Sequence, residues 1–189
     1  MPEGSAGKNM VLAVTGSIAA YKAASVVRGL MGRDHTVQVI MTDAARFFVT
    51  PTTFRALSGR PALYQLFPDE GSAGLTHIEL GEWAELMAVV PATANILGKF
   101  ASGLADDLVS CTWMACDCPR VIAPAMNDRM WESPATQRNY NRLKEREDVT
   151  FVEPVGGKLA SGKEATSGRL APVEDIIEKI HSVAIQAGL

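Results

Sequence analysis

Cysteine is scarce in this chain of 189 residues, which has only Cys111, Cys116 and Cys118. A small, odd number of cysteines argues against a disulfide framework. The spacing Cys-Asp-Cys at 116–118 is too tight for a pair of zinc ligands, and no second cluster stands elsewhere in the sequence. We therefore expect buried, reduced thiols and no metal site.

The chain also lacks a strong charge of either sign and a long apolar run. Its formal net charge of −3 gives no electrostatic reason to expect a nucleic acid or an anionic membrane surface as a partner. No apolar run approaches the roughly 20 residues that span a bilayer, and residues 1–9 lack the charged and then apolar plan of a signal peptide. We expect a cytoplasmic protein without membrane or nucleic-acid partners.

Two functional motifs are missing as well. The turn at residues 16–20 has a single glycine where a dinucleotide-binding fold has Gly-x-Gly-x-x-Gly, so NAD is not favoured, although Asp43 could imitate the acid that binds ribose. Gly-x-Ser-x-Gly is absent, and no nucleophilic triad is visible. One phosphate still suits the turn, because free backbone N–H groups at a helix N-terminus and the hydroxyl of Ser17 favour an anion. That combination fits a mononucleotide such as FMN.

What is present is the composition of a globular domain, with 47% hydrophobic and 21% charged residues. Short apolar runs alternate with helical patterns, and the runs occupy residues 10–15, 37–41, 86–90, 120–123 and 149–152. This alternation predicts a single doubly wound, Rossmann-like (flavodoxin-like) α/β domain of three layers with a mainly parallel sheet. The domain is expected over residues 9–189, after a disordered leader at 1–8. A glycine-rich segment at 155–170 is predicted to be a flexible flap over the site.

Polar side chains follow the apolar runs where a ligand crevice is expected. They are Ser17, Thr42, Thr93, Asn95 and Asn127. Because parallel strands end at one edge of the sheet, we expect these groups to converge there. Each of them alone is equally well explained as a helix cap or a turn residue.

Residues 124–131, with the sequence Pro-Ala-Met-Asn-Asp-Arg-Met-Trp, directly follow a buried run. They would present the amide of Asn127 at the carboxyl end of a strand. The alternative is a plain strand-to-helix turn, with Met130 and Trp131 packed in the core.

Among the three histidines, His77 is the acid/base candidate. We expect it in a loop just before a strand and beside the crevice, where an imidazole can exchange a proton near neutral pH. His35 and His181 are expected to be partly exposed loop histidines without a role.

Five motifs in order resemble the homo-oligomeric flavin-containing cysteine decarboxylases. That family includes phosphopantothenoylcysteine decarboxylase of coenzyme A synthesis and the peptidyl-cysteine decarboxylases of peptide pathways. The motifs are Gly-Ser-Ile-Ala-Ala-Tyr-Lys at 16–22, His-Ile-Glu-Leu at 77–80, Pro-Ala-Thr-Ala-Asn at 91–95, Gly-Leu-Ala-Asp-Asp-Leu at 103–108, and Pro-Ala-Met-Asn-x-x-Met-Trp at 124–131 with Pro-Ala-Thr-Gln behind it.

The resemblance implies FMN as the cofactor and a homo-oligomer, a trimer or a dodecamer of trimers, in which neighbouring subunits share each site. It implies His77 as the catalytic base and Asn127 as the catalytic amide that holds the substrate carboxylate, with Met130 and Ser161 also on the substrate side. The implied FMN-binding residues are Gly16, Ser17, Ile18, Thr42, Ala44, Ala45, Thr93, Ala94, Asn95, Ala125 and Met126.

The flap departs from one branch of the family at a single residue. Coenzyme A decarboxylases carry Ala-Cys-Gly, whose cysteine donates a proton in a final reduction, whereas this chain has serine at position 161. A hydroxyl is a far weaker acid than a thiol. We therefore predict FMN-dependent oxidative decarboxylation of the C-terminal cysteine of a ribosomally made precursor peptide, giving an aminoenethiol. The alternatives are a phosphopantothenoylcysteine decarboxylase and a non-catalytic FMN-binding regulatory subunit, against which the presence of both His77 and Asn127 argues.

Overall fold

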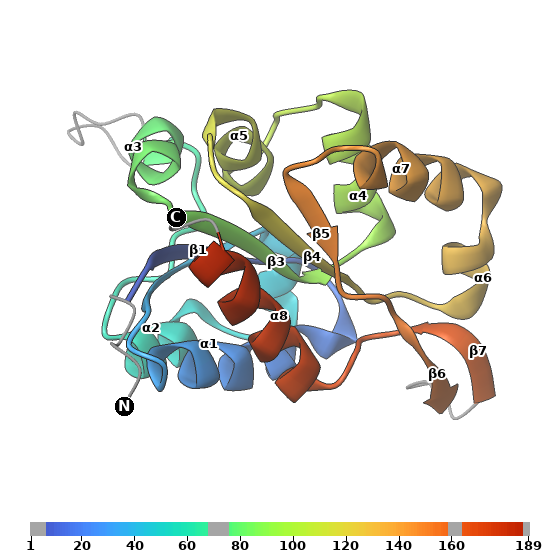
Figure 1. Cartoon of the computed structure of the whole chain (residues 1–189), viewed down its shortest axis with the longest axis horizontal. Helices are drawn as coiled ribbons and strands as arrows, with labels where there is room; N and C mark the ends of the chain where they lie inside the picture. Colours follow the sequence, from blue (N-terminus) through green and yellow to red (C-terminus); the bar gives the residue numbers. More distant parts are fainter. Residues whose placement is uncertain (1–6, 68–75, 159–163, 187–189) are drawn as a thin grey trace.

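A five-stranded parallel sheet forms the centre of the computed structural model, which describes residues 7–67, 76–158 and 164–186 (Figure 1). The strand order is β2-β1-β3-β4-β5. The strands are β1 (Asn9–Val14), β2 (Thr36–Met41), β3 (Leu86–Ala92), β4 (Arg120–Pro124) and β5 (Val149–Phe151). Residues 1–6 of the expected leader and Ser161 lie outside the described residues.

The strands read as continuous apolar runs because helices cover both faces of the sheet. Every residue of β3 is buried. Along β1, Met10 and Leu12 contribute to the core on one face and Val11 to the core on the other, as the alternation of side chains in a strand requires.

The helices form two layers around this sheet (Figure 1). One core is closed by α1 (Ala23–Met31), α2 (Pro51–Ser58) and α8 (Val173–Gln186). The other is closed by α3 (Thr76–Trp83), α4 (Ala94–Ser102), α5 (Leu108–Ala115), α6 (Asp128–Glu132) and α7 (Pro134–Lys144). Two short 3-10 helices, η1 (Ile18–Lys22) and η2 (Asp43–Phe47), follow β1 and β2. The predicted three-layer, doubly wound α/β fold is confirmed.

The segment around His77 differs from the prediction. His77 lies in the first turn of α3 and not in a loop before a strand. The prediction was wrong because it interpreted Gly81 as a turn residue, whereas Gly81 lies within α3. A Cβ built on Gly81 would stand 2.8 Å from the backbone of Ala115 in α5, so this glycine allows α3 and α5 to approach closely.

The segment predicted to be a flexible flap contains regular secondary structure in its described parts. The described parts of residues 155–170 form an antiparallel ribbon of β6 (Val155–Lys158) and β7 (Glu164–Arg169), separate from the main sheet. Gly157 has φ +124° and Gly168 φ +96°, a backbone region that favours glycine. The glycines therefore shape the strands of a ribbon.

The prediction of partly exposed loop histidines at 35 and 181 is wrong in two respects: His35 is buried, and His181, although partly exposed, lies in α8. His35 is 4% exposed, and its Nε2 lies 2.8 Å from Nδ1 of His181 in α8. Burial, and then the neighbouring His181, lower the pKa of His35. A neutral ring suits the place, because Nδ1 of His35 accepts a hydrogen bond from the backbone N–H of Lys8 at 3.1 Å. The pair fastens the start of the described chain to α8.

Arg120, at the start of β4, is 5% exposed. Its guanidinium donates to the carbonyl oxygens of Trp113 at 3.1 Å and Cys118 at 3.2 Å, and also to that of Cys116. It forms an ion pair with Asp148 as well. One cation thus joins the end of α5 to β4 and to the residue before β5.

We predict that Arg120→Leu lowers the free energy of unfolding by about 3 kcal/mol, because buried acceptors and a carboxylate lose their donor. Arg146 pairs with the same Asp148 but is exposed, so Arg146→Leu is a matched control with an expected loss below about 1 kcal/mol. Urea unfolding of both variants measures the difference. Equal losses would contradict the account.

Candidate functional site

A pocket of about 610 Å³ lies at the carboxyl ends of β1 and β3. The chain runs from β1 to β2 on one side and continues with β3 on the other, so the winding direction changes between these strands. Doubly wound sheets bind their ligands in the crevice outside such a switch point. The predicted residues that line the pocket are Gly16, Ser17, Thr42, Ala44, Thr93, Asn95, Ala125, Met126 and Met130.

Other predicted residues do not line this pocket. Ile18 is exposed, and Ala45 is buried beneath the surface. Ala94 lies in sequence between two lining residues, the cap residue Thr93 and Asn95 of α4. Asn127 is exposed next to Met126. The lining residues that we did not predict as site residues are Thr15, Ile96, Lys99, Asp106 and Asp107, and Asp43 also lines the pocket between the predicted residues Thr42 and Ala44.

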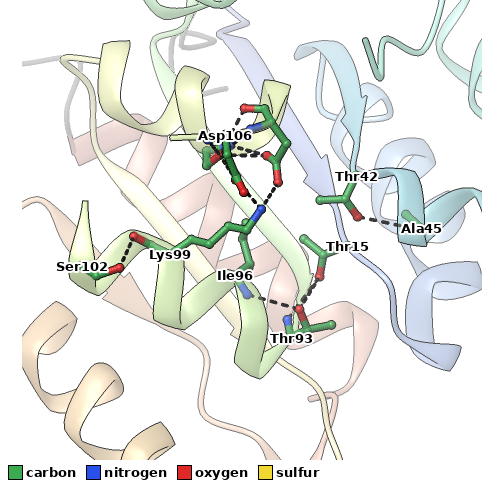
Figure 2. A network of polar contacts seen from close by, with 10 residues as sticks. Thr15, Thr42, Ala45, Thr93, Ile96, Lys99, Ser102 and Asp106 are labelled. Carbon is green, nitrogen blue, oxygen red and sulfur yellow. Dashed lines mark hydrogen bonds and ion pairs between the residues drawn. The ribbon is translucent and has the colours of Figure 1, made fainter. Parts of the chain in front are cut away.

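Thr15 and Thr93 hold the floor of the pocket together (Figure 2). Oγ1 of the buried Thr15 donates to the carbonyl of Pro91 at 2.7 Å and accepts from the backbone N–H of Thr93 at 3.1 Å. Oγ1 of Thr93 accepts from the N–H of Ile96 at 3.4 Å, so Thr93 caps α4 as well as lining the pocket. The ends of β1 and β3 are therefore fixed relative to one another.

Gly16 allows the turns after β1 and β2 to meet at one end of the pocket. A Cβ on Gly16 would stand 2.5 Å from Cβ of Ala44. Ser17 Oγ and Thr42 Oγ1 each accept one backbone N–H, at 3.3 Å. A hydroxyl that accepts in this way can still donate its own proton. This cradle of two hydroxyls and close backbone fits a phosphate group.

A charged cluster lies at another part of the pocket wall (Figure 2). Nζ of Lys99 lies 2.5 Å from Oδ1 of Asp106 and 2.6 Å from Oδ2 of Asp107. Burial lowers the pKa of Lys99, but the hydrogen bonds to both aspartates outweigh it and raise that pKa above its ordinary value. The hydrogen bond from Lys99 is the largest cause that lowers the pKa of Asp106.

Asp107 caps α5. Its Oδ1 accepts from the backbone N–H of Ser110 at 2.8 Å, and Oγ of Ser110 accepts in return from the N–H of Asp107. Asp106 is thereby left with Lys99 as its charged partner.

Residues 124–131 combine both interpretations of this segment. Oδ1 of Asn127 caps α6 by accepting the backbone N–H of Arg129 at 3.0 Å, which leaves the NH2 group of the amide as a donor. Trp131 packs edge-on against Tyr140 in the core, while the half-exposed Met130 lines the pocket.

The β6–β7 ribbon is attached to this same segment. The backbone N–H of Met126 donates to the carbonyl of Gly168 at 2.8 Å, and Thr166 Oγ1 donates to Glu132 of α6 at 3.2 Å. A Cβ on Gly168 would stand 2.7 Å from the carbonyl oxygen of Met126. Only glycine fits this contact without a shift of the backbone.

His77 is placed apart from these groups. It is half-buried on α3, and it is not a lining residue of the pocket. Within the described ranges its Nδ1 is buried without a hydrogen-bond partner.

Residues 7–67, 76–158 and 164–186 hold no group of three or more His, Cys, Asp or Glu side chains that could bind a metal ion. The three cysteines are free, and Cys116 and Cys118 are buried. In the same part of the chain, no helix is both long and apolar enough to span a membrane.

The family model described as Flavoprotein matches residues 2–185. The coenzyme A biosynthesis bifunctional protein CoaBC of Vibrio cholerae serotype O1 is 42% identical over 169 residues, which are 89% of this chain and 42% of that protein. The chain thus spans less than half the length of this relative.

Two solved structures are similar over nearly the whole chain. The FMN-dependent cysteine decarboxylase SpaF is 34% identical with a TM-score of 0.81, and the match covers 98% of this chain and 99% of that chain. A mutant PPC decarboxylase complexed with pantothenoylaminoethenethiol is 30% identical with a TM-score of 0.82, and the match covers 93% and 97%.

The contact at Gly168 predicts an effect on the pocket segment. Gly168→Ala adds a clash to a positive φ that alone costs about 1–2 kcal/mol, so the ribbon should detach and the amide of Met126 should exchange its hydrogen at least tenfold faster. Gly59→Ala is the control, because Gly59 has φ +71° but a Cβ there meets no atom within 4 Å. Hydrogen exchange by mass spectrometry measures this, and unchanged exchange in Gly168→Ala would contradict the prediction.

Proposed function

The chain belongs to the Flavoprotein family, and from this membership we propose that it is an FMN-dependent decarboxylase acting on a terminal cysteine. The observation that carries the proposal is the pocket at the β1/β3 switch point, with a cradle that fits phosphate at one end and Asn127 next to its wall. Its volume of about 610 Å³ is within the usual range of cofactor sites.

Gly16, Ser17 and Thr42 would hold the phosphate of FMN through hydroxyl and backbone donors. Residues 93–95 and 125–126 would flank the rest of the cofactor. When bound, FMN supplies the redox chemistry, because its ring accepts a hydride equivalent from the substrate cysteine.

Asn127 would bind the substrate carboxylate. Its Oδ1 is held by the N–H of Arg129, so its orientation is fixed and its NH2 group is the part that can donate to a ligand. An amide suits a carboxylate because it donates hydrogen bonds without the repulsion that an aspartate would cause. The thioaldehyde made by oxidation of the cysteine accepts the electrons released as carbon dioxide leaves.

His77 would act as the base of the oxidation from a neighbouring subunit. It does not line the pocket of its own chain, and its buried Nδ1 lacks a partner among the described residues. Large apolar side chains of η1 and η2, the short helices that follow β1 and β2, are exposed: Ile18 at 58%, Tyr21 at 60% and Phe47 at 91%. Exposed apolar side chains of this size favour contact with another copy of the chain. We propose a trimer, alone or within a dodecamer, that brings α3 of one copy to the pocket of another.

Ser161 supports a peptide as the substrate. Without a flap thiol to donate the final proton, the aminoenethiol is the expected product. The second candidate is phosphopantothenoylcysteine, favoured by the 42% identity to the CoaBC protein and by the PPC decarboxylase structure at 30%.

Mass spectrometry separates these functions. The purified protein is incubated with a Cys-terminated peptide and, separately, with phosphopantothenoylcysteine. Loss of about 46 mass units from the peptide, carbon dioxide plus two hydrogens that pass to the cofactor, supports the first function. Loss of carbon dioxide from phosphopantothenoylcysteine, with or without the two hydrogens, supports the second. If the protein binds FMN but changes neither substrate, it is a non-catalytic flavoprotein. If no FMN can be extracted from the protein, all three functions are contradicted.

His77→Asn is expected to abolish decarboxylation and to leave FMN bound, because the change removes a base but no part of the pocket wall. Product mass and extracted FMN are the two measurements. Survival of activity would show that the base is assigned wrongly.

Mixing subunits tests the shared site. When His77→Asn and Asn127→Ala subunits are co-expressed, some sites combine His77 of one with Asn127 of the other, and activity should partly return. No return of activity in assembled mixed oligomers would place His77 and Asn127 in the same subunit's site.

A further inference from the structure

Lys99 is a partly buried cation in the pocket wall that has no part in the proposed reaction. Its side chain is 14% exposed, and it shares one face of α4 with the lining residues Asn95 and Ile96. An ammonium group has three N–H donors. Two are directed to Asp106 and Asp107, and no third acceptor lies within hydrogen-bond distance among the residues that the structure describes. One donor is therefore left for a pocket ligand.

The charges of this cluster indicate which part of FMN would face it. Two carboxylates surround one ammonium, so the cluster carries a surplus negative charge. A phosphate would be repelled here, whereas the hydroxyls of Ser17 and Thr42 favour it at the other end of the pocket. The uncharged ring system of the cofactor suits the wall formed by Lys99.

We propose that Lys99 contacts the ring of FMN and keeps its reduction potential above the value that Asp106 and Asp107 alone would impose, while the two aspartates hold the ammonium in place. This inference rests on the proposed function, because it takes FMN as the occupant of the pocket. Reduction adds electron density to the ring, and a nearby positive charge in a partly buried site stabilises the reduced form more than the oxidised form.

The hydrogen bonds that Lys99 donates to both aspartates keep it charged at neutral pH, because they raise its pKa. A purely structural role would be to fasten α4 to the start of α5. The two roles differ in what the variants do. Loss of a structural contact would lower the stability of the protein whichever partner is removed. Loss of a charge would instead shift the reduction potential of FMN in a direction set by the sign of that charge.

The test uses the FMN-bound protein and three variants. Lys99→Met removes the charge at similar length, and Lys99→Arg keeps it. Asp106→Asn removes one carboxylate, and it is chosen because Asp107 also caps α5. The reduction potential of the bound FMN is measured by equilibration with a reference dye.

Lys99→Met is expected to weaken binding of reduced FMN relative to oxidised FMN at least tenfold, a shift of about 30 mV to more negative potential for a two-electron couple. Lys99→Arg should stay near the wild-type value, and Asp106→Asn should shift to more positive potential. An unchanged potential in Lys99→Met, or shifts of the same sign in Lys99→Met and Asp106→Asn, overturns the inference. If Lys99→Met fails to fold, Asp106→Asn decides alone, and no positive shift in it overturns the inference.

The result can be separated from a failure of the proposed function. Wild-type protein that binds FMN but decarboxylates neither substrate would overturn the proposed reaction, and the potentials of the variants would still decide the role of Lys99. Wild-type protein that binds no FMN would overturn both.

Discussion

The hydrogen bonds of Thr15 join the carboxyl ends of β1 and β3, and the site depends on this junction. The sheet is wound outward in both directions from these strands, so the turns that follow them must separate. The space between the turns becomes the pocket, and the buried strands keep its floor rigid. Every group proposed to bind the cofactor stands on a turn or helix that starts at this edge.

A second contact connects the pocket to the ribbon that the sequence suggests as a flap. Gly168 of β7 lies directly on the backbone of Met126, beside the amide that we assign to the substrate carboxylate. The backbone N–H of Arg129 orients the amide of Asn127, and the ribbon lies next to that amide. Closure of the ribbon over a substrate and binding of the substrate carboxylate would therefore involve one continuous surface. The role that we propose for Lys99 concerns the cofactor and not the substrate.

Sequence reasoning predicted the parts of this structure that depend on local pattern. The strands were recognisable because both faces of a parallel sheet are buried, and most of the pocket residues follow those strands directly. It failed where a distant contact decides. Gly81 marks a helix contact with Ala115 and not a turn, and His35 is buried by its pairing with His181. Lys99 was missed because its place depends on where α4 stands relative to Asp106 and Asp107.

The central claim is that the pocket holds FMN and that decarboxylation starts with oxidation of a cysteine. The most direct test mixes the FMN-bound protein with a Cys-terminated peptide in the absence of oxygen and follows the flavin absorbance together with carbon dioxide release. The account predicts lasting bleaching of the flavin, with one carbon dioxide released for each flavin reduced. Release of carbon dioxide with an unchanged flavin spectrum throughout would contradict it.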